Sequence, residues 1–167
     1  MSSHAAQNFD PQHYPIKDPS RLRVVVVQAT WNARITGELF NGCASVLHDS
    51  GLAKENVTLL KVPGSFELIG GAKLALENLN PDAVICLGCV VKGDTPHFEY
   101  VSQAVTQGLT ILQTQTTVPI VFGVLTVLNE KQADERLGGT HGHKGKEAAQ
   151  TALQMIALRQ TLEGLHG

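Results

Sequence analysis

The stretch that decides the fold is LRVVVVQA, residues 22–29. Its four consecutive valines form an apolar, β-branched run without alternating polar residues, which is typical of a strand buried on both faces of a parallel sheet. Beyond it, apolar residues recur at steps of three and four up to Ser50–Gly51, which predicts a helix that ends there. The apolar face of that helix consists of Ile35, Leu39, Cys43, Val46 and Leu47.

The same strand-then-helix pattern recurs along the chain. Further apolar runs cover residues 57–62, 83–91 and 120–127. Helical spacing follows these runs over residues 66–79, from Pro96 past Leu112, over 130–137 and over 146–165, with the glycine-rich GGTHGHKG between the last two. We therefore predict a three-layer α/β/α sandwich around a four-stranded parallel, flavodoxin-like sheet.

Length and charge narrow the class of protein. The 167 residues fit one domain, residues 21–167, preceded by an N-terminal arm, residues 1–20. The 13 basic and 15 acidic residues give a net charge of −2 without a basic cluster, which argues against a nucleic-acid-binding or membrane-binding surface.

No apolar run approaches the roughly 20 residues that span a bilayer. The N-terminus lacks the pattern of a secretory signal, and the three cysteines are expected to be reduced thiols, so the predicted location is the cytoplasm, or a plastid if a targeting segment was removed.

Each predicted strand is followed by a loop with chemically useful side chains. The four loops are ATWN (29–32), PGSFE (63–67), KGDTPH (92–97) and LNE (128–130). The carboxyl ends of parallel strands lie at one edge of a sheet, and open α/β folds bind their ligands there. We therefore expect the four loops to share one site.

Cys86 and Cys89 form a C-x-x-C pair, which in other contexts indicates redox or metal chemistry. A redox pair places its first thiol at a helix N-terminus, whereas both of these cysteines lie within a predicted strand. Residues three apart in a strand point to opposite faces, and Cys43 alone does not complete a zinc site. We interpret the pair as small buried apolar residues. His141 and His143 lack a third ligand, so no metal site is predicted.

The KGDTPH segment has two interpretations. Gly93 lets backbone amides turn inward, Thr95 adds a hydroxyl donor, and the positive end of a helix starting at Pro96 favours a bound phosphate. His97 could then transfer protons beside that anion. The alternative is an Asp-Thr-Pro helix cap without a ligand, with His97 as a surface or capping histidine.

Four other residues also allow both a functional and a purely structural interpretation. Trp31, the only tryptophan, is a candidate stacking platform for a planar heterocycle, with ordinary packing as the alternative. Phe66 and Glu67 suggest a second aromatic wall and a carboxylate for hydroxyl groups, although Glu67 could simply complement a helix N-terminus. Arg136 is a candidate phosphate clamp or a solvated charge.

Taken together, TWN, VPGSFE, GCVVKGDTPHFEYV, PIVFGVLT and ERLGGTHGHKG resemble the 6,7-dimethyl-8-ribityllumazine synthase family, over residues 22–158. The resemblance implies an enzyme that condenses 5-amino-6-ribitylaminouracil with 3,4-dihydroxy-2-butanone 4-phosphate and releases phosphate and water. This is the penultimate step of riboflavin biosynthesis. The resemblance also implies that the reaction uses no metal and no organic cofactor.

The resemblance further implies which residues bind the pyrimidine substrate. Trp31 is implied to stack on the pyrimidine ring, a place where many relatives have phenylalanine, and Glu67 to accept hydrogen bonds from the ribityl hydroxyls. The full set implied for the ring and the ribityl chain is Trp31, Asn32, Ser65, Phe66, Glu67, Cys89, Val90 and Val91.

The phosphate substrate and the proton transfer have their own implied residues. Asp94 and Thr95 are implied to hold the phosphate together with Arg136 from a neighbouring subunit. His97 matches the proton-transfer residue of the family. The remaining implied contacts are Phe122, also from the neighbour, and Lys144, a basic position near the site.

The resemblance implies sites between subunits of a homopentamer, and the compact RLGGTHGHKG favours an icosahedral 60-mer of twelve pentamers. Two rival hypotheses are a flavin binder without catalysis, whose ligand would be riboflavin, and a shell whose task is to enclose another protein. Trp31 would suit stacking on riboflavin. The intact Glu67, Thr95, His97 and Arg136 favour the synthase, because neither rival needs a phosphate site.

Overall fold

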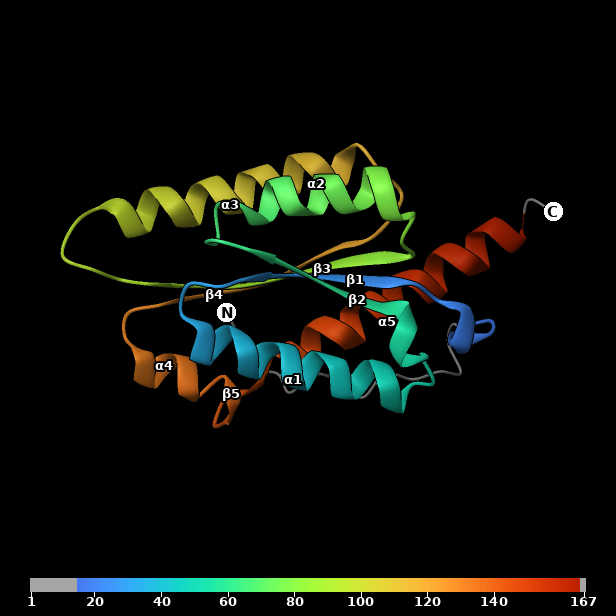
Figure 1. The fold of residues 1–167 in the computed structure, drawn as a ribbon, viewed down its shortest axis with the longest axis horizontal. Coiled ribbons are helices and arrows are strands. Elements are labelled where there is room, and N and C mark those ends of the chain that lie inside the picture. Colours follow the sequence, from blue (N-terminus) through green and yellow to red (C-terminus); the bar gives the residue numbers. More distant parts are fainter. Residues whose placement is uncertain (1–14, 166–167) are drawn as a thin grey trace.

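The computed structural model describes residues 15–165. Its main sheet has four parallel strands in the order β2-β1-β3-β4. Figure 1 shows this sheet edge-on, between two layers of helices. The strands are β1 (Val24–Ala29), β2 (Val57–Val62), β3 (Ala83–Val91) and β4 (Ile120–Val127). All four apolar runs are therefore confirmed as strands. The first strand begins at Val24 rather than at Leu22, because the Leu22 amide closes a 3-10 turn by donating to the Pro19 carbonyl oxygen.

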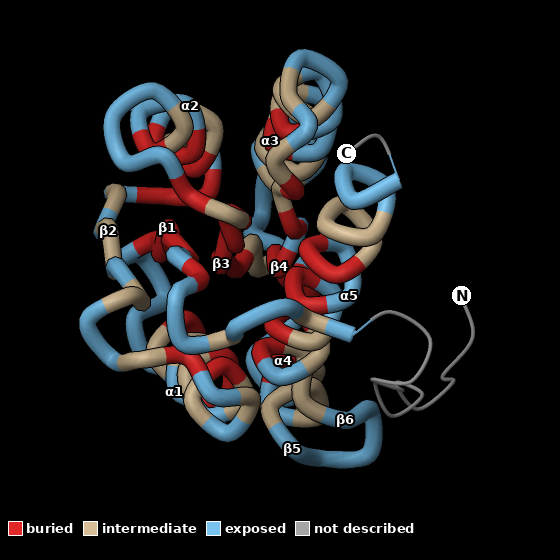
Figure 2. Tube along the Cα trace, turned by 90° about the vertical axis from the view of Figure 1, so that its right-hand side faces the viewer, coloured by how far each residue is buried: buried red, intermediate tan, exposed pale blue. Residues whose placement is uncertain are grey.

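Helices cover both faces of this sheet (Figure 2). Helices α2 (Leu68–Leu79) and α3 (His97–Thr114) lie on one face, and α1 (Ala33–Asp49), α4 (Glu130–Asp134) and α5 (Lys144–Gly164) lie on the other. Along β3, Ile85 and Leu87 join the core cluster that contains α1 and α5 residues. Val84 and Cys86 join the cluster that contains α2 and α3 residues. Burial on both faces explains why the strands read as unbroken apolar runs.

The segment between α4 and α5 differs from the prediction. It forms a small antiparallel hairpin, β5 (Leu137–Gly139) and β6 (Gly142–His143), where the sequence predicted the end of a helix and then a loop. The glycines that suggested a loop permit a tight turn instead, because Gly138 and Gly142 have φ of 110° and 75°, which L side chains rarely adopt. Consequently α4 ends at Asp134, and α5 begins at Lys144 rather than Lys146. Helix α2 likewise begins at Leu68 rather than at residue 66.

The predicted N-terminal arm falls largely outside the described residues, which begin at Pro15. Of its described part, Ile16 packs against the core, and the Lys17 amide donates to Oε1 of Gln160 at 2.9 Å. A second 3-10 turn, Lys54–Asn56, leads into β2. Among the described residues, no helix is both long and apolar enough to cross a membrane.

Candidate functional site

The loops after β1 and β2 are joined by backbone hydrogen bonds at the carboxyl edge of the sheet. The Thr30 amide donates to the Val62 carbonyl oxygen at 2.8 Å, and the Trp31 amide donates to that of Pro63 at 2.9 Å. The Thr30 hydroxyl also donates to the Pro63 carbonyl oxygen at 3.1 Å. These bonds extend the pairing of the two strands beyond their ends. They fix the loop that carries Trp31 against the loop that carries Glu67.

Trp31, Gly64 and Glu67 form what we call the aromatic corner. The indole of Trp31 lies directly over Gly64, where an added Cβ would be 2.5 Å from the indole Cε3. The Gly64 amide donates to Oε2 of Glu67 at 3.0 Å, which holds that carboxylate beside the indole. Trp31 is 64% exposed and Phe66 54% exposed, so two aromatic surfaces face outward here. Both aromatic rings are therefore exposed, as a stacking surface requires, and their role in binding stays a prediction.

Asn32 links the aromatic corner to the end of β3. The residue has φ 57°, and its Nδ2 donates to the Cys89 carbonyl oxygen at 3.0 Å. Cys89 is buried, whereas Val90 and Val91 are half-buried at the end of the strand. Ser65 is also buried, and its Oγ has no hydrogen-bond partner among the described residues. This hydroxyl lies against β3, 2.7 Å from the position of a Cβ added at Gly88.

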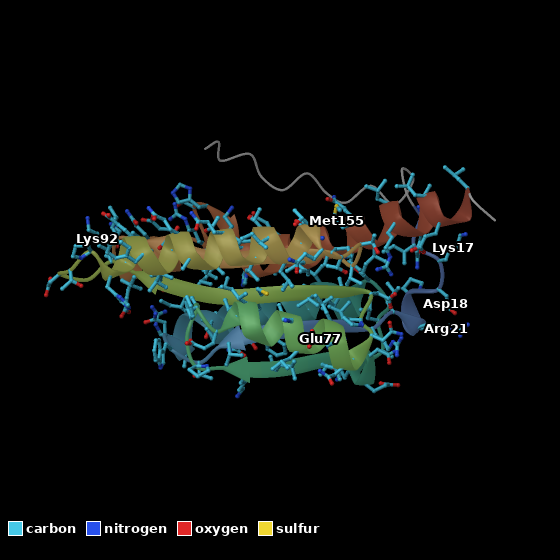
Figure 3. The ribbon with its side chains drawn as sticks, turned by 90° about the horizontal axis from the view of Figure 1, so that it is seen from above. Lys17, Asp18, Arg21, Glu77, Lys92 and Met155 are labelled. Carbon is cyan, nitrogen blue, oxygen red and sulfur yellow. The ribbon has the colours of Figure 1, made fainter. Side chains whose placement is uncertain are left out.

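The loop between β3 and α3, residues 92–96, projects beyond the sheet. In Figure 3 its Lys92 lies at one end of the molecule, and Lys17, Asp18 and Arg21 lie at the opposite end. Helix α3 begins at His97 rather than at Pro96, and the Pro96 carbonyl oxygen accepts from the Glu99 amide at 2.9 Å. The positive end of an 18-residue helix therefore opens onto this loop, which favours an anion. The loop residues Asp94 and Thr95, together with His97, are exposed.

The remaining predicted residues lie toward the other edge of the sheet. Strand β4 is the edge strand opposite β2 (Figure 2), and its Phe122 is 45% exposed. Nη1 of Arg136 donates to the Gln132 carbonyl oxygen at 2.8 Å, and the Lys144 ammonium pairs with Glu147 at 2.8 Å. The hydrogen bonds and ion pairs found within residues 15–165 do not connect these three residues to the aromatic corner. Arg136 and Lys144 thus make their side-chain polar contacts within their own α4–α5 segment.

An apolar groove of about 460 Å³ extends from the aromatic corner along α2. It is lined by Val62, Phe66, Glu67, Ile69, Gly70, Gly71 and Leu74. Sequence reasoning identified Phe66 and Glu67 but missed the helical part of this lining. The available signal was Leu74, which is 60% exposed and lies outside the buried stripe of Leu68, Ala72 and Ala75.

The C-x-x-C pair is confirmed as two buried residues on opposite faces of β3. Cys86 and Cys89 belong to the two different core clusters, on opposite faces of β3, and all three cysteines are free thiols. Burial raises the pKa of Cys86 to about 12. Burial, with a smaller effect of Glu130, raises the pKa of Cys89 to about 11 against the opposing effect of Arg34. Neither thiol is poised to become a thiolate nucleophile near neutral pH.

Within residues 15–165, no group of three His, Cys, Asp or Glu side chains is arranged to hold a metal ion. His141 and His143 illustrate the reason. The imidazole of His141 lies 3.8 Å from Oε2 of Glu135 at the surface, whereas His143 points its ring against α1, close to Gly42. The two histidines of GTHGHKG therefore have different surroundings.

Comparison with known proteins gives a consistent result. The family model described as 6,7-dimethyl-8-ribityllumazine synthase matches residues 21–160. Proteins of that name from Parabacteroides distasonis and Porphyromonas gingivalis are 47% and 45% identical to this chain, over 91% and 94% of it and 96% of each relative. A protein of the same name from Cytophaga hutchinsonii is 47% identical over 94% of this chain and 98% of its own length.

Proposed function

Because the chain belongs to the 6,7-dimethyl-8-ribityllumazine synthase family, we propose that the loops at the carboxyl edge of its sheet bind the two substrates of that reaction. The enzyme acts in riboflavin biosynthesis. It condenses 5-amino-6-ribitylaminouracil with 3,4-dihydroxy-2-butanone 4-phosphate, with release of inorganic phosphate and water. Its site therefore needs a surface for a planar ring, acceptors for a polyol and a pocket for a phosphate.

The aromatic corner binds the ribitylaminopyrimidine. The observation that carries this assignment is the exposed Trp31 indole seated on Gly64 beside the Glu67 carboxylate. Stacking against one face of the indole gives the pyrimidine ring a large, rigid contact. The Gly64 amide occupies Oε2 of Glu67, so Oε1 is available to accept from the ribityl hydroxyls. The other residues assigned to this substrate are Asn32, Ser65, Phe66, Cys89, Val90 and Val91.

The loop of residues 92–96 binds the phosphate of the second substrate. The amides of Asp94 and Thr95, the Thr95 hydroxyl and the positive end of α3 supply the donors. Arg136 of a neighbouring subunit completes the cradle, because a guanidinium binds a phosphate through two parallel hydrogen bonds. His97, at the first position of α3, lies next to this loop and transfers protons during the reaction.

The order of steps follows from the chemistry of the two substrates. The 5-amino group of the pyrimidine attacks the substrate ketone, and loss of water leaves an imine. Removal of a proton from the adjacent carbon shifts the electron pair so that the C–O bond to phosphate breaks and phosphate leaves with the bonding electrons. Elimination leaves an enol, which takes up a proton at its terminal carbon and loses the hydroxyl proton to become a ketone. The second amine then attacks this new carbonyl carbon, and loss of another water closes the ring. Most of the acceleration comes from holding two molecules in fixed geometry, and stabilisation of the departing phosphate supplies the rest.

A second subunit supplies the other half of each site. The strand order supports this proposal, because it puts the aromatic corner beside edge strand β2 while Phe122 lies on the opposite edge strand. A ring of subunits in which the β2 side of one chain faces the β4 side of the next would bring Phe122 to the aromatic corner of a neighbour. We propose a homopentamer in which Phe122, Arg136 and Lys144 reach the site of the neighbour. The two-residue turn between β5 and β6 is compact, which favours the 60-mer of twelve pentamers. Sedimentation velocity separates these two assemblies.

Turnover is the direct test of the proposed function. The purified protein is mixed with both substrates, lumazine product is followed by its green fluorescence, and released phosphate is counted. Product formation above the uncatalysed rate, with one phosphate per product, is the expected result. No acceleration by the assembled protein, together with tight riboflavin binding, would contradict the proposal and favour the flavin-binding hypothesis. The cytoplasmic location inferred from the reduced thiols stays a prediction.

A further inference from the structure

His143 lies in a gap on the surface of α1 that we call the Gly42 notch. A Cβ added at Gly42 would lie 2.6 Å from both ring nitrogens of His143, so the absence of a side chain there is what admits the imidazole. The other side of the ring faces the hairpin, where a Cβ at Gly138 would be 3.8 Å from Cδ2. Two residues further on, a Cβ at Gly145 would collide with the backbone of Leu39. The start of α5 is therefore seated closely on α1, with the His143 ring filling the notch.

This contact is adjacent to the two basic residues of the site. Leu137 and His143 are paired across the hairpin, directly after Arg136 and directly before Lys144. A backbone hydrogen bond joins these two basic residues to each other, from the Lys144 amide to the Arg136 carbonyl oxygen at 2.9 Å. The His143 ring thus lies one residue from Lys144 and across the hairpin from the residue that follows Arg136.

The surroundings of the ring favour its neutral form. Nδ1 is buried, and no described residue offers it a hydrogen bond. Burial, and then the charge of Lys146 on α5, lower the pKa of His143 below its ordinary value, against smaller opposing effects that include Glu38 on α1 and Glu147 on α5. The facing strand, Leu137–Gly139, has no titratable side chain. A proton added to the ring would place a charge in the partly buried notch, where the weaker effects of Glu38 and Glu147 do not offset the cost of burial.

We infer that His143 is a positioning residue, whose imidazole in the Gly42 notch fixes where the β5–β6 hairpin presents Arg136 and Lys144. The inference rests on the proposed function, in which these cations serve the phosphate end of the site. It predicts that removing the ring weakens use of the phosphate substrate without changing use of the pyrimidine. It also predicts a pH dependence. Because the folded state disfavours the protonated ring, the stabilisation is complete above the unfolded pKa of about 6.5 and is lost as pH falls through the lower folded value.

A set of matched variants tests the notch directly. His143→Ala removes the ring, and Gly42→Ala adds the methyl group that displaces it. Each is expected to raise KM for the four-carbon phosphate about tenfold, since small misplacements of positioning groups cost one to two orders of magnitude. KM for the ribitylaminopyrimidine should stay within twofold. The double variant, in which the methyl group added at position 42 fills part of the emptied space, should recover much of the loss. His141→Ala, which removes the exposed histidine two residues away, is the control and should behave as the wild type.

Hydrogen exchange of residues 137–145 in the substrate-free protein gives a readout that does not depend on catalysis. His143→Ala should speed exchange there, and the double variant should slow it again. Single variants with unchanged phosphate KM, or a double variant as impaired as the sum of the singles, would overturn the inference. If the wild type makes no product, the proposed function fails. In that case faster hairpin exchange in His143→Ala, reversed in the double variant, still supports the positioning role, and unchanged exchange overturns it.

A pH profile of KM tests the pH-dependent part of the inference. His143→Phe keeps an aromatic ring in the notch but cannot be protonated. The ratio of wild-type to His143→Phe KM for the phosphate substrate should therefore rise as pH falls through the lowered pKa of the His143 ring in the folded protein, while titration of the substrate itself cancels in the ratio. A ratio that stays constant from about pH 8 to about pH 5 would remove the pH-dependent part of the inference.

Discussion

The aromatic corner and the loop of residues 92–96 sit at the same edge of the sheet but are built in different ways. In the aromatic corner, each part is held by another part of the same chain, through the Trp31 amide, the Gly64 amide and the contact of the indole with Gly64. The loop of residues 92–96 projects outward, and a Cβ added at its Gly93 would meet nothing within 4 Å. One region is therefore preorganised within the chain, and the other is open.

This difference suggests how the two substrates are handled. A preorganised surface suits the larger pyrimidine, because little ordering is required when the ring stacks. An open loop at a helix N-terminus suits a phosphate, whose charge can be held by amides and by a cation from elsewhere. Substitutions in the aromatic corner should accordingly change KM for the pyrimidine substrate, and substitutions that affect the loop of residues 92–96 or its cation should change KM for the phosphate substrate.

Arg136→Ala is expected to have the largest effect and to act on the phosphate side alone. Removing a charge-assisted pair of hydrogen bonds costs about 3 kcal/mol, which corresponds to roughly a 100-fold loss in kcat/KM. Steady-state kinetics with each substrate varied in turn should place the loss with the four-carbon phosphate. Arg21→Ala, an exposed arginine at the opposite end of the molecule (Figure 3), is the control. A loss shared equally between the two substrates would contradict the division of the site.

His97→Ala is expected to reduce kcat about tenfold, below the roughly 10²–10⁴-fold typical of general acid–base catalysis. The reason is that orientation of the two substrates supplies most of the rate, and that contribution survives without the imidazole. Single-turnover measurements at saturating substrate give the chemical step directly. Complete loss of turnover with both substrate affinities intact would show that His97 is indispensable and that the division of labour proposed here is wrong.

The sequence predicted the sheet well because burial on both faces leaves a direct record in it. Val24–Val27 and the run from Ala83 to Cys89 are continuous and apolar for the same reason that they are central strands. The hairpin after α4 could not be predicted in this way. Its strands are three and two residues long, and their glycines read equally well as a loop.

The candidate site likewise has residues that the sequence predicted and contacts that it did not. Residues that directly follow strands, such as Trp31 and Glu67, were identified because topology brings the carboxyl ends of parallel strands together. Contacts that depend on the packing of elements far apart in the sequence were not identified. The Gly42 notch has no local sequence signal, since it depends on α1 and the start of α5 lying against each other.

Gly64→Ala is expected to have the smallest effect of the three and to act on the pyrimidine side alone. The new methyl group would meet the Trp31 indole at 2.5 Å and Oε2 of Glu67 at 3.1 Å, so the exposed indole must move. Loss of about 1 kcal/mol of stacking corresponds to roughly a fivefold higher KM for the ribitylaminopyrimidine, with the phosphate KM unchanged. Gly37→Ala is the matched control: its added Cβ meets nothing within 4 Å on α1, so it should leave both KM values unchanged and stabilise the fold by about 0.5–1 kcal/mol. If Gly64→Ala left the pyrimidine KM equal to that of Gly37→Ala, the indole would not be part of the binding surface, and the aromatic corner would be a packing feature of the β1 and β2 loops instead.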